Sequence, residues 1–166
     1  MAKLERRGLF YRVVIEDYVN DKMGPLPSRA QEGRFHDQGM ELVTYLAGGA
    51  ETAWMEVGAR WQGHPDPEPY RMLEVRANVA RVADLTDPSI RRKYGVELSA
   101  LVGTDWKPCQ RLARRLRAEG FEALWTFSRA DYPPGRQLVV FLSQLNPGSY
   151  VRVVNVHGIR EIISLD

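Results

Sequence analysis

Residues 33–60 decide the fold, and they read GRFHDQGMELVTYLAGGAETAWMEVGAR. The run LVTYLA at residues 42–47 is rich in the β-branched and aromatic residues that favour strands. Gly48 and Gly49 follow, and glycine ends a strand because it has no side chain to pack. We therefore predict a strand, a glycine turn and a second element that begins at Ala50.

The second element has the periodicity of a helix. Its apolar residues recur every three or four positions on one face, and they are Ala50, Ala53, Trp54, Val57 and Trp61. Glu56 lies two positions after Trp54, about 200° further around the helix, so it points away from this face. Glu56 alone fits a solvated surface as well as a functional site, and Arg34 alone fits an exposed loop.

The remaining chain mixes strands and helices without a regular strand–helix–strand order. We predict strands over residues 10–16, 121–127, 137–142, 150–156 and 159–164, and either two strands or one bent strand over 70–75 and 78–85. Helices are predicted to start near Pro88 and near Thr104, the second with Trp106 and Cys109 on its apolar stripe. This order favours an α+β fold: a single domain with a largely antiparallel sheet and flanking helices.

Composition limits the classes of function. A chain of 166 residues is long enough for one domain with a substantial core. Its net charge of +2 gives no general argument for binding nucleic acid or membranes, and a single cysteine excludes a disulfide framework. We find no signal peptide, transmembrane run, phosphate-binding loop, dinucleotide fingerprint or metal-binding motif, and we expect a cytoplasmic protein.

Several motifs together resemble the RES domain, the toxin half of bacterial toxin–antitoxin pairs. The family pattern of glycine, arginine and aromatic residue corresponds to residues 33–35, its tyrosine-leucine-alanine strand to residues 45–47, and its helical glutamate to Glu56. His36 and Phe35 replace the commoner asparagine and tryptophan. Further similarity at residues 84–88 and 103–110 extends the resemblance over most of residues 11–145.

The resemblance implies a single RES-like domain over residues 1–166, with a core at about 10–145 and a fold like the ADP-ribosyltransferase toxins. It implies an enzyme that cleaves the nicotinamide–ribose bond of NAD+, with phosphate (a phosphorylase) or water (a hydrolase) as acceptor. NAD+ is then the substrate, inorganic phosphate is the co-substrate of the phosphorylase, and no cofactor or metal is implied. NAD+ depletion and growth arrest would follow.

The resemblance also assigns residues to the site. The catalytic residues carried over are Arg34, Glu56 and Ser128, and the substrate-binding residues are Arg12, Tyr45 and His36. Arginines offer the bidentate contacts that a diphosphate requires, and a fixed carboxylate stabilises positive charge on the ribose. The polar loop over residues 17–32 leads into this pocket, and we expect it to help cover the pocket.

Partners and rival functions also follow. The resemblance implies a cognate antitoxin of the Xre type and a homodimer within the complex, with no direct binding of nucleic acid or membrane. One alternative is a protein ADP-ribosyltransferase on the same fold. Another is a non-enzymatic module that binds nucleic acid or a partner through a basic helix face, formed by Arg111, Arg114, Arg115 and Arg117.

Overall fold

The computed structural model describes residues 4–38, 42–61 and 63–165. The strands are β1 Leu4–Ile15, β2 Val43–Ala47, β3 Tyr70–Asp84, β4 Ala123–Phe127, β5 Arg136–Phe141 and β6 Tyr150–Gly158. The helices are α1 Ala50–Trp61, α2 Pro88–Tyr94, α3 Leu98–Val102, α4 Lys107–Ala118 and α5 Ile159–Ile162, with short 3-10 turns at Glu16–Tyr18 and Leu142–Gln144.

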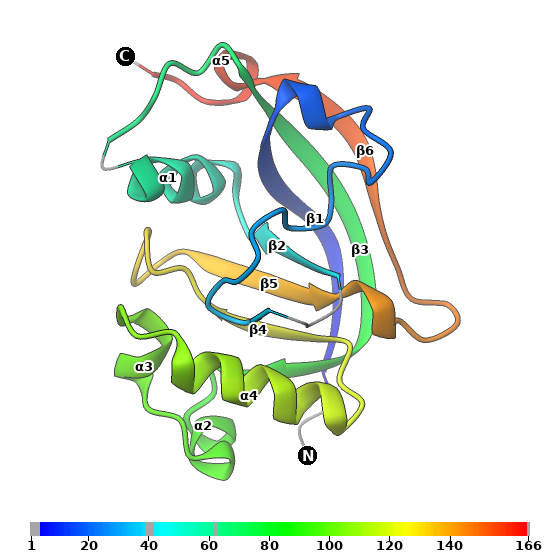
Figure 1. Ribbon diagram of the computed structural model, residues 1–166, viewed down its shortest axis with the longest axis vertical. Coiled ribbons are helices and arrows are strands. Elements are labelled where there is room, and N and C mark those ends of the chain that lie inside the picture. The colour runs from blue at the N-terminus through cyan, green and yellow to red at the C-terminus, as the bar shows by residue number, and fades with distance from the viewer. Residues whose placement is uncertain (1–3, 39–41, 62, 166) are drawn as a thin grey trace.

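The strands form a sheet that closes on itself (Figure 1). The order β1-β2-β5-β4-β3 returns to β1, because β1 also pairs with β3, and β6 is added to β3. The described pairs are antiparallel except for β3 and β4, which are parallel at Val82–Asp84. The predicted α+β fold with a largely antiparallel sheet is therefore confirmed.

Strand β3 is the longest element and joins the parts of the sheet. It spans fifteen residues as one strand, which settles the two alternatives for this region. One of its edges pairs with β1 from Tyr70 to Val82, and the other pairs first with β6 and then with β4. The β1–β2 contact that closes the ring rests on a single pair, Tyr11 and Ala47.

Helices cover the sheet in two separate places (Figure 1). The group α2–α4 packs on β4 and β5 through a cluster that includes Leu101, Leu112 and Phe141. Helix α1 packs with α5 on β1 and β3 through Trp54, Met72 and others. The buried residues of α1 include Ala53, Trp54 and Val57 of the predicted face, but Trp61 at the end of the helix is 60% exposed, contrary to the prediction. Burial of this apolar surface holds the helix with its other side turned toward β4 and β5.

Two further local predictions are wrong. Residues 159–162 form a helix, not a strand, because Glu161 accepts a hydrogen bond from the Gly158 amide at 2.6 Å and Ile159 packs into the α1 cluster. Trp106 does not join the apolar stripe of α4. It precedes the helix and is 39% exposed, because the helix begins at Lys107, whose amide donates to Asp105. Among the described helices, none combines the length and apolar character needed to cross a membrane.

Candidate functional site

Glu56 lies at the centre of the candidate site. It projects from α1 on the side away from Trp54 and accepts two hydrogen bonds, from Ser128 Oγ at 3.1 Å and from Gln137 Nε2 at 2.6 Å. Ser128 follows the end of β4, and Gln137 lies in β5 opposite Ala47 and Thr126. The carboxylate therefore joins a helix to two neighbouring strands.

The surroundings of Glu56 are enclosed and cationic. Burial raises the pKa of its carboxyl group from 4.5 to about 7, although the Ser128 hydrogen bond and the positive charges of Arg12 and Arg60 act in the opposite direction. Asp131 adds a smaller upward effect and is itself held by Thr52 Oγ1 at 2.7 Å. The group therefore titrates near neutral pH, which is typical of functional carboxylates in clefts.

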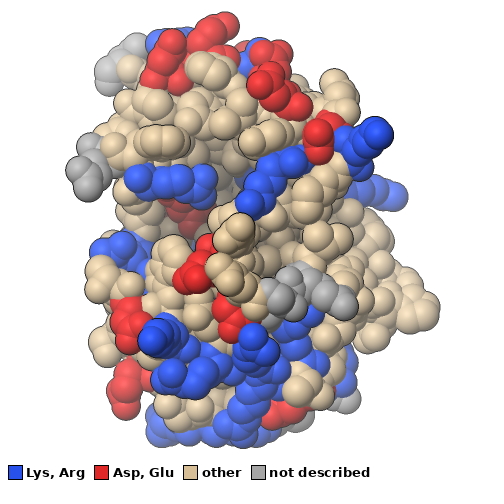
Figure 2. Space-filling model, viewed as in Figure 1, with Lys and Arg blue, Asp and Glu red and all other residues tan. Residues whose placement is uncertain are grey.

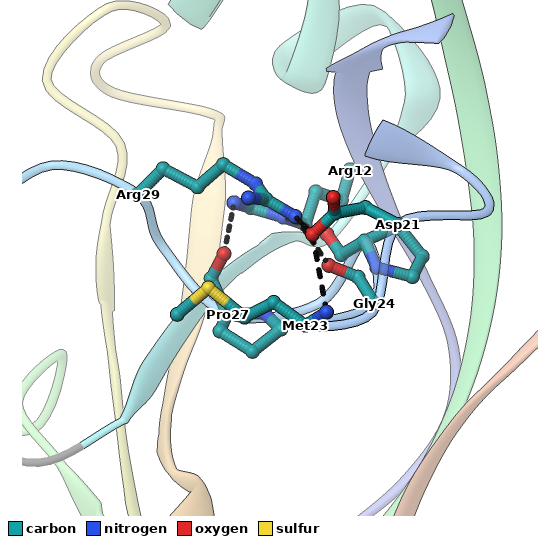
Figure 3. A network of polar contacts seen from close by, with 7 residues as sticks. Arg12, Asp21, Met23, Gly24, Pro27 and Arg29 are labelled. Atoms are coloured by element: carbon teal, nitrogen blue, oxygen red, sulfur yellow. Dashed lines mark hydrogen bonds and ion pairs between the residues drawn. The ribbon is translucent and has the colours of Figure 1, made fainter. Parts of the chain in front are cut away.

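Arg12 binds a segment that we call the strap, residues 19–32 (Figure 3). Its guanidinium donates from Nε to Pro25 O at 3.1 Å, from Nη2 to Pro27 O at 3.4 Å and from Nη1 to Tyr45 O at 3.4 Å. Burial lowers the pKa of Arg12 to about 10, so the group keeps its charge at neutral pH. Arg12 is thus an enclosed cation whose described hydrogen-bond acceptors are main-chain carbonyls.

A second arginine fixes the outer part of the strap (Figure 3). Arg29 Nη2 lies 2.9 Å from Asp21 Oδ2 and donates to Gly24 O at 3.0 Å, while its guanidinium stacks on Tyr18 at 3.9 Å from the ring centroid. Asp21 also accepts from the Met23 amide at 3.1 Å. The strap therefore has two polar attachments, one inside the fold at Arg12 and one at the surface.

Tyr45 and His36 hold the turn that carries Arg34. The Tyr45 hydroxyl accepts from the Phe35 amide at 3.0 Å and lies 2.7 Å from His36 Nδ1, while His36 Nε2 lies 3.0 Å from the carbonyl of Ala30. A carbonyl only accepts, so Nε2 carries the imidazole proton and Nδ1 accepts from Tyr45. Burial raises the pKa of Tyr45 above its usual value.

Gly33 and α4 complete the turn. A Cβ at Gly33 would lie 2.8 Å from both the Tyr45 hydroxyl and His36 Cε1, so a side chain does not fit without displacing them. Gln110 on α4 donates to the carbonyls of Gly33 and His36 at 3.0 and 3.3 Å. The close packing explains why a glycine precedes the arginine here.

The structure divides the six predicted site residues into two groups. The first group is Glu56 with Ser128 and Arg12, which lie near its carboxylate. Arg34 lies in the second group, on the α3–α4 side of Tyr45, where it donates to Ala100 O at 3.3 Å beside Cys109. Tyr45 links the groups, since its carbonyl contacts Arg12 and its hydroxyl contacts His36. Figure 2 shows a recess below α1 in which acidic atoms lie between basic ones.

Some site residues carried no clear sequence signal. Gln137 is one polar residue in the apolar strand QLVVFL, and its contact with Glu56 bridges 81 positions. Arg60 follows Glu56 by one helical turn, which is a signal that helical periodicity could have provided. Among the described residues, no three His, Cys, Asp or Glu side chains are grouped so as to hold a metal ion.

The fold and the site together define a class: an α+β protein with a closed, largely antiparallel sheet and an enclosed glutamate facing serine, glutamine and arginine. The sequence model of the RES domain matches residues 9–160, and the chain belongs to this family. No curated protein sequence matches the chain significantly. A chain in the crystal structure of the M. tuberculosis MbcT-MbcA toxin-antitoxin complex is similar in fold, with a TM-score of 0.76, 21% identity, and coverage of 97% of this chain and 91% of that one.

Proposed function

We propose that this protein is the toxin of a toxin–antitoxin system and an enzyme that cleaves the nicotinamide–ribose bond of NAD+. The observation that carries the proposal is the setting of Glu56, an enclosed carboxylate held by the neutral donors Ser128 and Gln137 and placed near the cation of Arg12. Membership of the RES domain family supports the toxin class, and the fold shared with the MbcT-MbcA structure agrees with it.

The chemistry of this bond matches what the site offers. Nicotinamide leaves as a neutral molecule from a cationic ring, so the leaving group requires no proton donor. Positive charge instead develops on the ribose, as in glycoside cleavage, and a preorganised negative charge beside it lowers the barrier. Glu56 supplies this charge. Its pKa of about 7 leaves it partly protonated at neutral pH before the substrate binds, and the cationic nicotinamide ring favours the ionised form on binding.

The other residues bind and orient the substrate. Arg34 contacts the diphosphate, because Arg12 already uses three of its N–H groups on carbonyls and acts mainly through its charge. Ser128 fixes the carboxylate and the ribose pose. Tyr45 contributes its ring face to the nicotinamide end, since its hydroxyl is occupied, and His36 acts through Tyr45.

Partners follow from the same class. We propose a cognate antitoxin of the Xre type that neutralises the enzyme in the cytoplasm, and a homodimer within that complex. Co-expression with the neighbouring reading frame, followed by co-purification and measurement of the complex mass, tests both parts. An enzyme that arrests growth equally with and without that reading frame would contradict the antitoxin assignment.

The decisive experiment incubates the purified protein with NAD+, with and without inorganic phosphate, and resolves the products by mass. Release of nicotinamide confirms the reaction class. A phosphorylated ADP-ribose formed only with phosphate identifies a phosphorylase, plain ADP-ribose identifies a hydrolase, and a mass increase on the protein itself or an added protein identifies an ADP-ribosyltransferase. Intact NAD+ in every mixture, with a folded protein, overturns the proposal.

A matched pair of variants ties the reaction to the site. Glu56→Gln keeps the size of the side chain and removes its charge, so we expect NAD+ loss to fall by about a hundred- to a thousandfold, typical of removing a key electrostatic group. Glu51→Gln makes the same change on an exposed position of α1 and should retain full activity. Comparable rates for the two variants would remove Glu56 from the mechanism.

A further inference from the structure

The two oxygens of the Glu56 carboxylate have different surroundings. Ser128 Oγ and Gln137 Nε2 both donate to Oε2, at 3.1 and 2.6 Å. Within the described part of the chain, no donor lies at hydrogen-bond distance from Oε1, and Oε1 is not among the buried oxygens without a partner. Oε1 therefore keeps some exposure to solvent, while Oε2 is anchored in the fold.

The anchor is rigid because of where Gln137 lies. Strand β5 is paired on both sides, with Ala47 of β2 and Thr126 of β4 opposite Gln137. Ser128 is fully buried, and its amide donates to the Gly135 carbonyl at 2.9 Å, so the second donor is also fixed. A helix alone would leave the Glu56 side chain free to change rotamer, and the two donors, Gln137 in β5 and Ser128 just after β4, restrict this.

We propose that Gln137 is a positioning residue that locks Oε2 of Glu56 to strand β5, so that Oε1 is presented to the ribose of the bound nucleotide. This role rests on the proposed function. A neutral amide suits it better than a cationic donor, because lysine or arginine would form an ion pair and reduce the negative charge available to the ribose. The amide fixes the carboxylate and leaves its charge intact.

Other charged groups also shift the pKa of the Glu56 carboxyl group, so they must be considered in any pH-dependent test. They are Arg12 from β1, Arg60 from α1 itself and Asp131 from the segment after β4. These groups remain unchanged in variants of Gln137. A change in the titration of Glu56 in such variants therefore reports the lost or altered hydrogen bond.

Two near-isosteric variants give opposite pH responses. Gln137→Met removes the donor, so the carboxylate loses a stabilising contact and its pKa rises above about 7. A rise of one unit reduces the ionised fraction of the free protein at pH 7 from about half to about one-tenth, so we expect kcat/KM, which reports the free protein, to fall about fivefold there and to recover as the pH is raised.

Gln137→Glu instead creates a pair of carboxyl groups that share a proton. While the pair holds one proton, the new acid can donate to Glu56, and activity is retained. When that proton leaves, two negative charges face each other and activity falls. The Met variant thus gains activity with rising pH, and the Glu variant loses it. A merely structural role for Gln137 would lower activity by the same factor at every pH.

A titration without substrate keeps this inference separate from the proposed reaction. The Glu56 carboxyl carbon, labelled with ¹³C and assigned through Glu56→Gln, is followed by NMR against pH in each folded protein. We expect a higher midpoint in Gln137→Met than in the wild type, and an unchanged midpoint in the control Gln144→Met. Gln144 makes a comparable pair of hydrogen bonds far from the site, to the carbonyls of Arg117 and Phe121.

The outcomes are distinct. An equal midpoint in wild type and Gln137→Met, or a uniform loss of kcat/KM without a shift of its pH profile, overturns the positioning role. If NAD+ is untouched by the wild type, the proposed reaction fails, and with it the presentation of Oε1 to a ribose. The NMR midpoint then still decides whether Gln137 anchors the carboxylate.

Discussion

The site and the outer face of α4 use arginine in opposite ways. Arg12 is enclosed, and its described hydrogen bonds go to three main-chain carbonyls. Arg114 on α4 is exposed and makes two hydrogen bonds with Asp37, at 2.9 and 2.7 Å. Removing the enclosed arginine leaves three carbonyl groups without this hydrogen-bond donor, whereas water can replace the exposed arginine as the partner of Asp37. Burial therefore decides which arginine contributes more to the stability of the fold.

The same comparison weakens the reading of α4 as a nucleic-acid surface. Besides Arg114, Arg115 pairs with Glu119 at 3.1 Å and lies over Tyr94, and the Arg117 guanidinium lies over the Phe141 ring. Much of the positive charge on this face is therefore already engaged within the fold. Direct contact with nucleic acid stays an unfavoured alternative.

The largest effect is expected at Arg12. Arg12→Met leaves the carbonyls of Pro25, Pro27 and Tyr45 without their donor, so we expect the free energy of unfolding to fall by about 3 kcal/mol and NAD+ loss to fall with it. Urea unfolding followed by tryptophan fluorescence measures the first quantity. A loss below about 1 kcal/mol would mean that Arg12 behaves like an exposed arginine, and the comparison would break.

Glu56 gives the next effect, with a definite dependence on pH. Its pKa is raised from 4.5 to about 7 in the folded protein, so the unfolded chain releases this proton first and the wild type loses stability between these two values as pH rises. Glu56→Gln removes that loss. We expect the variant to be about 1 kcal/mol less stable than the wild type below pH 4.5, because of the buried amide, and about 2 kcal/mol more stable at pH 8, since the shift is worth roughly 3 kcal/mol between these two conditions.

Thermal unfolding across this pH range measures the difference. A stability gap that does not change with pH would contradict an enclosed, ionisable Glu56. The predicted combination is unusual for a point variant, because the protein becomes inactive and more stable at the same time.

Tyr45 extends the comparison of enclosed and exposed side chains to a neutral group. Tyr45→Phe removes the partner of the Phe35 amide and of His36 Nδ1, so we expect a loss of about 2 kcal/mol in unfolding free energy. Tyr132→Phe is the control, since this tyrosine is 43% exposed and packs edge-on against Phe127. Equal melting temperatures for the two variants would show that the hydroxyl of Tyr45 does not hold the turn.

The smallest effect is expected at Arg114. Arg114→Gln should lower the unfolding free energy by less than about 1 kcal/mol, and the difference should shrink at high salt because the pair with Asp37 is exposed. Denaturant unfolding at low and high ionic strength measures this. A salt-independent loss of several kcal/mol in unfolding free energy would mean that Arg114 behaves like the enclosed Arg12 instead.

Local sequence patterns predicted most of the secondary structure. The strand before Gly48, the helix from Ala50 and the strands over residues 121–127 and 137–142 were found close to their predicted positions. The first strand starts earlier than predicted, at Leu4, because pairing with β3 orders a polar segment that has no strand pattern of its own. Ile159 and Ile163 fit either period, and packing against α1 selected the helix.

The candidate site was less accessible from sequence. The resemblance placed Arg34, Tyr45 and Glu56 in one candidate segment, yet helical periodicity left open whether Glu56 faces water. Strands β4 and β5 answer this, because they bring Ser128 and Gln137 to the helix from the last third of the chain. Arg12 looked like a ligand for phosphate, and its carbonyl partners in the strap could not be inferred from any local pattern.

Strand β3 also has a consequence for the order in which the protein can fold. β1 is made first, but its long partner lies at Tyr70–Asp84, so the segment that carries Arg34, Tyr45 and Glu56 is looped out until β3 arrives. Such distant pairing is slow, because the ends of a long loop must meet before any stabilising contact between them can form. The donors for Glu56 leave the ribosome later still, in β4 and β5. During synthesis, the chain therefore contains Glu56 long before Ser128 and Gln137 are available to hold its carboxylate.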